Sequence, residues 1–416
     1  VDAADSVNRA GGANAAGGAN GSGGAAAFPF APGAFFQPPP EYGRLRETCP
    51  LAPVVMPSGA PARLALRHAD VREALGDPRF TRDLTFPGAP RFAPGLSVDD
   101  DPFSISNMDP PEHSRLRRIA SSAFTPRRVA SWRPRVAEIA AELADGFGAP
   151  PVDLVEAYAL PLPTLVICEL LGVPAADRDR FRAWSDAFLS TSDLAEDERV
   201  EQFGRFLDYA AALVAERRAT PGGGLLDAMI EATDQGATFT EDELVHMVVT
   251  LILAGHETTR TMIARGMFTL LRHPEQYVML CRDEASVAGA VEEILRFDVP
   301  ADAALLRLAR EPVALPAGPV GAGEVVIPVL ASANRDPGLF DRPDVFDVTR
   351  ADNPHLAFGH GPHYCMGANL ARMELEVAVG TLARRHPALR LAVAPEEIRW
   401  TDGGLMHGPR ALPVTF

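Results

Sequence analysis

The chain has 416 residues, 47% of them apolar and 23% charged, which is typical of a globular protein with a large core. Its net charge of -16 argues against binding to nucleic acid or to an anionic membrane surface, since both favour basic proteins. Four cysteines without paired spacing indicate a reducing compartment, and the longest apolar run, Met247 to Gly255, is too short to cross a bilayer. No basic and apolar leader opens the sequence. We therefore expect a cytoplasmic monomer with no nucleic-acid or membrane partner.

Residues 1–27 are almost entirely Ala, Gly, Asn and Ser, so they offer too little apolar surface to offset the entropy lost on ordering. We predict a disordered tail over 1–27 and a single domain over 28–416, because no linker-like stretch interrupts the later sequence. Pro53 to Val55 and Arg63 to Leu66 flank a Ser58-Gly59 turn, which predicts a β-hairpin.

Most of the remaining sequence carries apolar residues at spacings of three and four, which predicts amphipathic helices. They are expected at Arg135 to Phe147, Ala175 to Leu189, Glu198 to Arg218 and Ala285 to Phe297. The strongest helix runs from Thr240 to His273, with a capping box at its start and Pro274 after its end. At about 1.5 Å per residue this helix is on the order of 50 Å long. The expected fold is mainly α-helical with small β-sheets.

Polar residues interrupt the apolar centre of this long helix, in the run from Ala254 to Thr259. An acid and a hydroxyl group in a core helix are costly unless they are paired or useful. One interpretation is structural: Glu257 forms a salt bridge or faces solvent, and Thr258 bonds back to the carbonyl of Ala254. The other interpretation is catalytic, and the residues by themselves leave both open.

Cys365 lies in a loop rich in Gly and Pro, from Phe358 to Gly367, that opens into a helical pattern. Backbone N–H groups and the positive end of the following helix are expected to favour a thiolate at its sulfur. A lone thiolate without a second cysteine nearby is a poor zinc site and a good axial ligand for haem iron. The plain alternative is a small buried apolar side chain.

Several residues of this loop, at fixed spacing, closely resemble the cysteine-ligand loop of the cytochrome P450 family in its soluble bacterial form: Phe358, Gly361, His363, Cys365, Gly367, Leu370 and Ala371. The resemblance implies the fold of that family, with haem b between the long helix and the helix after the cysteine. It implies that Cys365 binds the iron, that Phe358 shields the sulfur and that His363 reaches a haem propionate. Gly361 is implied to allow a tight turn, and Gly367 a close approach to the porphyrin.

The resemblance extends to the long helix, where the Ala-Gly-x-Glu-Thr sequence ending at Thr258 is similar to the family's oxygen-activation motif. It implies that Thr258 holds oxygen and an ordered water, that Glu257 relays protons from solvent and that Ala254 lies beside the cofactor. Thr250 and Leu253, one turn earlier, are then expected to line the substrate pocket with Ala254.

Glu293 and Arg296 lie three residues apart on one predicted helix, so their side chains can meet. Taken alone, such a pair is usually a solvated surface pair of little energetic value. The spacing resembles the buried scaffold pair of the same family, which a later arginine completes, and this implies Arg350 as the third member of a structural triad.

Cationic side chains for the two haem propionates are also implied by the resemblance. His113 and Arg117, one helical turn apart, are implied to bind one propionate, and Arg307 with His363 the other. Without the resemblance, the segment around His113 reads as a basic surface helix.

The resemblance covers nearly the whole chain except the tail and implies a haem-thiolate monooxygenase, which inserts one atom of O2 by hydroxylation or epoxidation. Electrons are expected from NAD(P)H through a ferredoxin reductase and a ferredoxin, because the chain has no flavin or iron–sulfur segment. Arg115, Arg118 and Arg372 are expected to supply positive charge for ferredoxin docking.

Three alternatives to this monooxygenase stay open. The first is a haem enzyme driven by peroxide or one that couples substrates oxidatively, which the Glu257 and Thr258 pair disfavours. The second is a haem-thiolate binding or sensor protein without catalysis. The third is a metal site built on His360, His363 and Cys365, which lacks a fourth ligand nearby.

The substrate is the least determined part of the prediction. By resemblance, the segment from Leu84 to Ser104 is the loop above the pocket. Candidate substrate contacts are mostly small or apolar: Phe86, Phe92, Phe188, Thr250, Leu253, Ala303, Leu305, Leu405 and Met406. They predict a roomy, non-ionic pocket for a small-to-medium apolar molecule, by analogy a secondary metabolite such as a polyketide. Ordinary core packing is the alternative for each of them.

Overall fold

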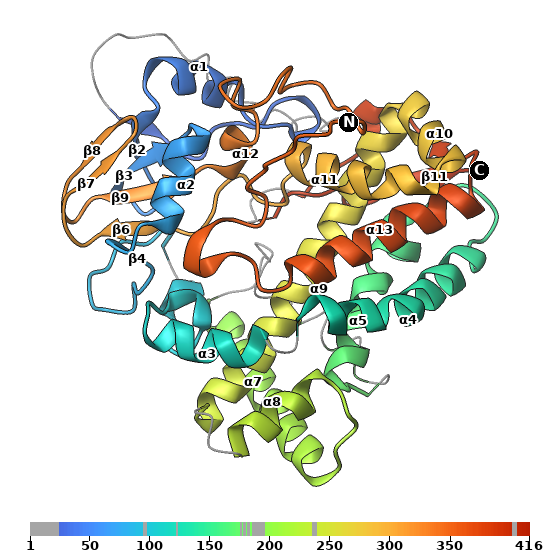
Figure 1. Ribbon diagram of the computed structural model, residues 1–416, viewed down its shortest axis with the longest axis horizontal. Helices are drawn as coiled ribbons and strands as arrows, with labels where there is room; N and C mark the ends of the chain where they lie inside the picture. The colour runs from blue at the N-terminus through green and yellow to red at the C-terminus, as the bar shows by residue number, and fades with distance from the viewer. Residues whose placement is uncertain are drawn as a thin grey trace, which may run out of the picture.

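The computed structural model describes residues 25–94, 98–121, 124–174, 177, 180, 184, 196–234, 239–401 and 406–416. Most of its β-strands gather on one side of the molecule, and most of its helices lie on the other (Figure 1). The described helices are α1 (Pro40–Thr48), α2 (His68–Gly76), α3 (Glu112–Ser121), α4 (Pro126–Asp145), α5 (Pro161–Leu171), α7 (Glu196–Ala219), α8 (Leu225–Asp234), α9 (Glu241–Arg272), α10 (Pro274–Arg282), α11 (Val287–Phe297), α12 (Leu330–Ala333) and α13 (Ala368–Arg385). The predicted mainly α-helical fold is confirmed.

The strands form three small sheets. The strands are β1 (Ala26–Ala27), β2 (Leu51–Val55), β3 (Pro61–Ala65), β4 (Phe80–Thr81), β5 (Val152–Asp153), β6 (Arg307–Ala309), β7 (Val313–Leu315), β8 (Gly318–Val320), β9 (Val325–Pro328), β10 (Arg390–Leu391) and β11 (Pro413–Thr415). The largest sheet has the order β1-β2-β3-β9-β6-β4, and the others are β10-β11-β5 and β7-β8. The predicted hairpin is the antiparallel β2–β3 pair.

Two residues of the predicted tail belong to the largest sheet. Ala26 and Ala27 pair in parallel with β2, although the sequence places the start of the domain at Phe28. Strand pairing uses backbone groups, so two alanines join the sheet edge without contributing much apolar surface. Residues 1–24 of the predicted tail lie outside the described residues.

The long central helix forms as predicted. The Thr240 hydroxyl accepts a hydrogen bond from the Glu243 N–H at 3.2 Å, and the Glu243 carboxylate accepts one from the Thr240 N–H at 2.8 Å, which completes the capping box. The helix ends at Arg272, before Pro274. It packs against α5, α7, α11 and α13, so it crosses the core of the molecule. Accordingly, every residue from 261 to 271 is buried.

The other helix predictions have mixed outcomes. Helices α7 and α11 lie within two residues of the predicted bounds. The predicted start of α4 at Arg135 is wrong, because the helix begins at Pro126, where the Thr125 side chain accepts from the Arg128 N–H. Pro134 lies exposed inside the helix, where it removes only one backbone hydrogen bond. Most of the predicted helix from Ala175 to Leu189 lies outside the described residues.

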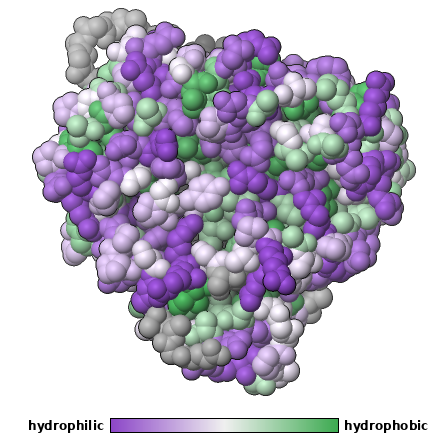
Figure 2. Space-filling model, in the orientation of Figure 1, coloured by the Kyte–Doolittle hydropathy of each residue, from purple (hydrophilic) through white to green (hydrophobic). Residues whose placement is uncertain are grey.

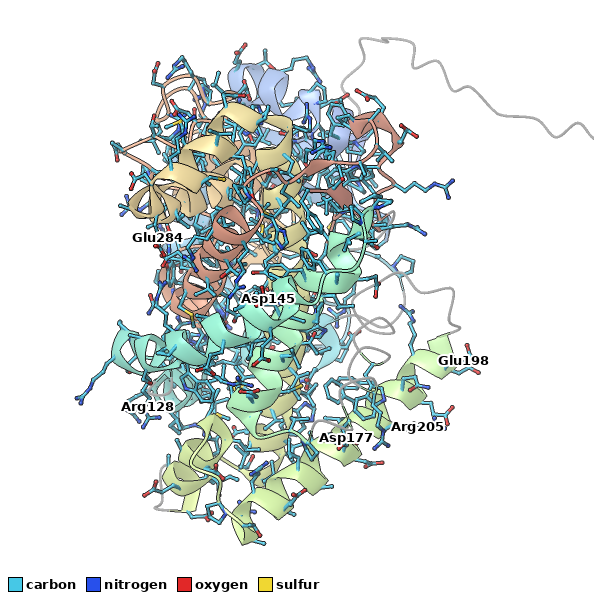
Figure 3. The ribbon with its side chains drawn as sticks, turned by 90° about the vertical axis from the view of Figure 1, so that its right-hand side faces the viewer. Arg128, Asp145, Asp177, Glu198, Arg205 and Glu284 are labelled. Atoms are coloured by element: carbon cyan, nitrogen blue, oxygen red, sulfur yellow. The ribbon has the colours of Figure 1, made fainter. Side chains whose placement is uncertain are left out.

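Helix α13 follows the Cys365 loop and lies along α4 (Figure 3). Two exposed ion pairs join its last turn to neighbouring elements: Arg385 pairs with Asp145 at the end of α4, and Arg384 pairs with Glu284. Exposed pairs of this kind contribute little energy. The position of α13 therefore depends mainly on its buried residues, which pack in the largest hydrophobic core with those of α4 and α9.

The surface shown in Figure 2 is mainly hydrophilic, with hydrophobic residues scattered over it. In the described part of the chain, no helix has the length and apolar character that a membrane span requires.

Candidate active site

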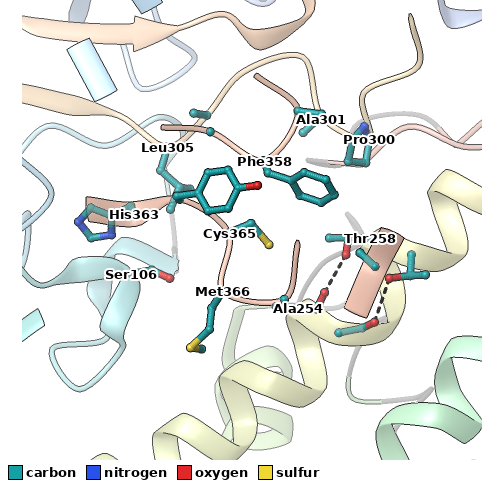
Figure 4. Close-up of a pocket in the computed structure, with 18 of the residues that line it drawn as sticks. Ser106, Ala254, Thr258, Pro300, Ala301, Leu305, Phe358, His363, Cys365 and Met366 are labelled. Carbon is teal, nitrogen blue, oxygen red and sulfur yellow. Dashed lines mark hydrogen bonds between the residues drawn. The ribbon is translucent and has the colours of Figure 1, made fainter. Parts of the chain in front are cut away.

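A cavity of about 450 Å³ lies between α9, the Cys365 loop and the segment 300–305 (Figure 4). Cys365 comes from the loop on one side of this cavity, and Thr258 comes from α9 on the other. Ile105 and Ser106 contribute from the segment before α3. The cavity therefore joins the two motifs that the sequence singled out.

The loop that carries Cys365 is shaped by backbone hydrogen bonds and by glycine. The Cys365 N–H donates to the Phe358 carbonyl at 2.8 Å, and the Tyr364 N–H donates to the Gly361 carbonyl at 3.0 Å. Gly361 has a φ of 72°, and a Cβ atom there would lie 2.6 Å from the Leu75 carbonyl oxygen of α2. Only glycine allows both this backbone conformation and this close approach.

Cys365 is open to the cavity but surrounded by protein on its other sides. Burial raises the pKa of its thiol, and this outweighs the N–H of Gly367 and the positive charges of Arg117 and Arg372, which lower it. The Gly367 N–H favours the thiolate as the sequence predicts, and desolvation acts against it. A metal cation bound at this position would deprotonate the thiol.

Phe358 and Gly367 flank the cysteine and line the cavity. The guanidinium of Arg372 lies 4.5 Å from the centre of the Phe358 ring, and two hydrogen bonds to Glu292 hold it there. A Cβ atom at Gly367 would meet no other atom within 4 Å, so packing among the described residues does not require glycine at this position. The free space beside Gly367 fits a planar group that lies against the backbone.

Basic side chains gather at one edge of the cavity: Arg82, His113, Arg117, Arg307 and His363. The rings of His113 and His363 lie 4.2 Å apart. Burial, followed by the positive charge of Arg307, lowers the pKa of His363 to about 2, and burial with Arg117 lowers that of His113 to about 4. Burial and the charge of Arg82 lower the pKa of Arg307 to about 9.

This edge fits the carboxylates of a haem. The Nδ1 atom of His113 is buried and makes no hydrogen bond to any described residue, and the Arg307 side chain donates to the carbonyls of Leu305 and Leu306. Neighbouring basic groups that lower one another's pKa values are stabilised when an anionic group binds beside them. A propionate beside His113 and Arg307 would supply the missing acceptor and negative charge.

Thr258 and Ala254 face the cavity from α9, but Glu257 does not line it. The Thr258 hydroxyl donates to the Ala254 carbonyl at 2.7 Å (Figure 4), and the Glu257 carboxylate accepts from Arg260 at 2.6 Å. These are the contacts of the structural interpretation. They do not exclude the catalytic one for Thr258, because a hydroxyl that donates to a carbonyl keeps its lone pairs for a further donor.

The scaffold residues Glu293, Arg296 and Arg350 come together as predicted. Arg296 makes a two-pronged pair with the Glu293 carboxylate, both bonds at 2.7 Å, and Arg350 reaches the same carboxylate at 3.1 Å. The side chains of Glu293 and Arg296 are fully buried. This cluster holds the chain around Asp347 against α11, and none of its three residues lines the cavity.

The predicted substrate contacts have three outcomes. Thr250, Ala303, Leu305 and Met406 line the cavity. Phe86 is exposed, Phe92 packs edge-on against Phe28 at 5.9 Å, and Leu253 is buried in the core, so the prediction for these three residues is corrected. Phe188 and Leu405 lie outside the described residues. The sequence analysis missed the lining residues Ile105, Ser106, Ile167, Pro300 and Ala301, which carry no local signal beyond being small or apolar.

Two of the three predicted docking arginines are engaged within the protein. Arg115 forms two hydrogen bonds with Glu243 at the start of α9, and Arg372 is held by Glu292. Arg118 is exposed. No three His, Cys, Asp or Glu side chains of the described ranges form a group that could hold a metal ion, which leaves the proposed His and Cys metal site without support.

Glu374 of α13 is a buried acid that the sequence analysis missed. It lines the cavity, is 1% exposed, and its Oε2 atom has no hydrogen-bond partner among the described residues. Burial raises the pKa of this carboxyl group well above its usual value. The folded protein therefore binds this proton more tightly than the unfolded chain does, and stability is lost as the pH rises above the unfolded pKa.

We expect Glu374→Gln to raise the free energy of unfolding at pH 7 by more than the ~0.5 kcal/mol typical of a surface substitution. The gain should shrink as the pH falls toward 4, where both states carry the proton. Urea unfolding at several pH values measures this difference, with Glu376→Gln, two residues along the same helix, as the partly exposed control whose carboxylate pairs with Arg133. A gain that does not depend on pH would contradict the prediction.

Known proteins resemble this chain over almost its whole length. The family model for "Cytochrome P450" matches residues 190–288 and 285–389. The chain is 43% identical to the mycinamicin IV hydroxylase/epoxidase of Micromonospora griseorubida, over 90% of this chain and 94% of that protein. It is 41% identical to the vitamin D(3) 25-hydroxylase of Pseudonocardia autotrophica, over 92% and 95%. The chain belongs to the cytochrome P450 family.

A solved structure agrees with this assignment. The crystal structure of the LnmA cytochrome P450 hydroxylase from the leinamycin pathway of Streptomyces atroolivaceus superposes with a TM-score of 0.87, at 43% identity, over 94% of this chain and all of that one. This P450 is therefore a haem-thiolate monooxygenase that uses O2, and the predictions of its family, fold and reaction class are confirmed.

Proposed function

We propose that this P450 hydroxylates or epoxidises a neutral, mainly apolar secondary metabolite, of the size and character of a polyketide. The observation that carries the proposal is the composition of the cavity wall opposite Cys365. The described residues that line it from α9 and from segment 300–305 are uncharged. A charged substrate group would lose its hydration there without gaining a partner.

Sequence identity alone does not select the substrate. The two relatives named above share 43% and 41% of their residues with this chain, yet one is named for a mycinamicin and the other for vitamin D3. The choice therefore depends on a few wall residues, of which Ile105, Ala301 and Leu305 are candidates.

We assign the cofactor contacts as follows. Cys365 binds the iron, His113 with Arg117 binds one propionate, Arg307 with His363 binds the other, and Phe358, Gly367 and Ala254 flank the ring. When bound, the haem with its thiolate ligand supplies the activation of O2 and the oxidation of an unreactive carbon. The protein excludes water, orients the substrate and controls the delivery of protons.

Proton control is assigned to α9. With its hydrogen atom held by the Ala254 carbonyl, the Thr258 oxygen accepts a hydrogen bond from a water in the cavity and so fixes that water beside the reacting centre. Glu257 relays protons from solvent to this water. Since Glu257 pairs with Arg260 and does not line the cavity, its carboxylate must leave that pair to do so.

We expect Thr258→Ala to lower product formed per O2 consumed by roughly tenfold or more, because misplaced protons divert oxygen to H2O2. Thr259→Val is the matched control, since Thr259 also lines the cavity and bonds back to its helix at 3.2 Å. Product, O2 and H2O2 are measured with NAD(P)H, a ferredoxin reductase and a ferredoxin, which we propose as the electron source. Unchanged coupling, or turnover that H2O2 supports and this system does not, would overturn the assignment.

The substrate class is tested by titrating neutral and charged organic molecules into the ferric protein and following the low- to high-spin shift of the Soret band. We expect neutral apolar molecules to cause the shift, and their carboxylate or ammonium analogues to bind at least ~10-fold more weakly. Preferential binding of a charged analogue would refute the proposed substrate class.

For ferredoxin docking we propose the exposed Arg118 face of α3.

A further inference from the structure

Arg82 is a buried arginine in the wall of the haem cavity. It directly follows β4, and its side chain is 1% exposed. Its own backbone N–H donates to the Asp109 carboxylate at 2.9 Å, which fixes the backbone of the residue. A charge this deeply buried is costly unless several partners satisfy it.

The guanidinium of Arg82 joins two parts of the wall that are far apart in sequence. Its Nη2 atom donates to Asp99 at 2.7 Å and to Asn107 at 2.8 Å, and its Nε atom donates to the Ser106 carbonyl at 3.1 Å. On the other side, Nη1 donates to the Leu306 carbonyl at 3.1 Å, directly before β6. One rigid, planar group therefore connects the segment 99–107 to the strand that carries Arg307.

Arg82 also belongs to the basic edge of the cavity. It lines the same cavity as Arg307 and His363, and its positive charge contributes to the lowered pKa of both, after burial. The bonds above engage four N–H donors, and a guanidinium has five. One donor therefore remains for an anionic group in the cavity.

The segment 99–107 forms part of the substrate wall. Ile105 and Ser106 line the cavity, and Asn107 donates from its amide to the Asp101 carbonyl at 2.9 Å. The Asp101 carboxylate lies 2.8 Å from a ring nitrogen of His246 on α9. The segment thus spans the wall from Arg82 to α9, and its position decides where Ile105 meets a substrate.

We propose that Arg82 is a positioning residue that links the propionate edge of the cavity to the segment 99–107, so that haem retention and the shape of the substrate wall depend on the same side chain. The inference rests on the propionate position proposed above. A propionate that accepts from the free N–H of Arg82 would hold the guanidinium in the orientation that Asp99, Ser106 and Asn107 require.

The test compares three holoenzyme variants: Arg82→Gln, Arg82→Lys and Asp99→Asn. Together they distinguish the effect of the positive charge of Arg82 from the effect of the hydrogen bonds made by its planar guanidinium. Arg91→Gln is the matched control, because Arg91 pairs with Asp100 of the same segment at 2.7 Å but does not line the cavity. Haem release is followed by transfer to apomyoglobin, and the placement of the segment by backbone hydrogen exchange of peptides covering 99–107.

We expect Arg82→Gln to speed both haem release and exchange by about tenfold, the loss of one charge-assisted hydrogen bond. Arg82→Lys should keep haem release within about threefold of the unaltered protein while exchange rises, because a lysine keeps the charge but not the fork. Asp99→Asn should loosen the segment with little effect on haem release. A pattern in which Arg82→Gln matches Arg91→Gln in both measurements would overturn the proposal.

A folding failure of Arg82→Gln is covered by the double variant Arg82→Gln/Asp99→Asn, which leaves no unpaired buried charge. It should show the same acceleration of both rates, and normal rates would equally refute the proposal. The ferrous–CO spectrum and haem release from Arg307→Gln test the cofactor assignment separately. If the spectrum is normal and Arg307→Gln releases haem faster, a negative result at Arg82 counts against this inference alone.

Discussion

Replacement of Cys365 by serine is expected to abolish the strongly red-shifted Soret band of the ferrous–CO complex and to reduce monooxygenation by roughly 10³-fold or more. Serine is close in size to cysteine, so the loop and its backbone hydrogen bonds to Phe358 should persist. A hydroxyl group is a far weaker ligand and electron donor than a thiolate. The loss therefore reports on iron ligation rather than on folding.

Cys281→Ser provides the control for this experiment. Cys281 lies on α10, is partly buried and does not line the cavity, and it should retain the band and the activity. Circular dichroism of both variants checks that the fold is intact. A Cys365→Ser protein that keeps the red-shifted band would mean that another group binds the iron, and it would refute the assignment.

The second large effect is expected at the scaffold. Arg296→Met should lower the free energy of unfolding by about 3–5 kcal/mol, because it leaves the Glu293 carboxylate buried without its principal partner. The lost guanidinium also donates to the carbonyls of Asn334, Pro343 and Val345 at 2.8–3.1 Å. Urea unfolding followed by circular dichroism measures the change.

Arg342→Gln is the control for the scaffold variant. Its side chain is 60% exposed and pairs with Asp341 and Asp347, so its removal should cost less than ~0.5 kcal/mol. If Arg296→Met cost no more than this control, the buried cluster would not be a stabilising element. The ferrous–CO spectrum of any folded Arg296→Met protein should remain normal, since Arg296 does not line the cavity.

Features with local signals were predictable from the sequence. The capping box at Thr240 and the proline after His273 determine the bounds of α9 because both act within one helical turn. Likewise, the spacing around Cys365 and the glycine at 361 follow from backbone requirements within a short loop. The residues of the scaffold triad could be named, although only by resemblance, because Arg350 is distant in the sequence.

Features that depend on distant partners were not predictable. Arg82 donates hydrogen bonds to Asp99, Asn107 and Leu306, and no short sequence pattern predicts these contacts. The same holds for Phe92, since an apolar loop residue can face the cavity or, as here, pack against Phe28. The raised pKa of the Cys365 thiol follows from burial, which becomes visible only when the surrounding elements are placed.

The capping box of α9 has a consequence for protein engineering. The Glu243 carboxylate that caps the helix also accepts the hydrogen bonds of Arg115, two residues after His113 on α3. A single acid thus joins the start of α9, which carries Thr258, to α3, which carries His113. Chimaeras that exchange the substrate wall with a relative should take both crossover points outside Glu112–Ser121 and Thr240–Glu243, or import the two segments together.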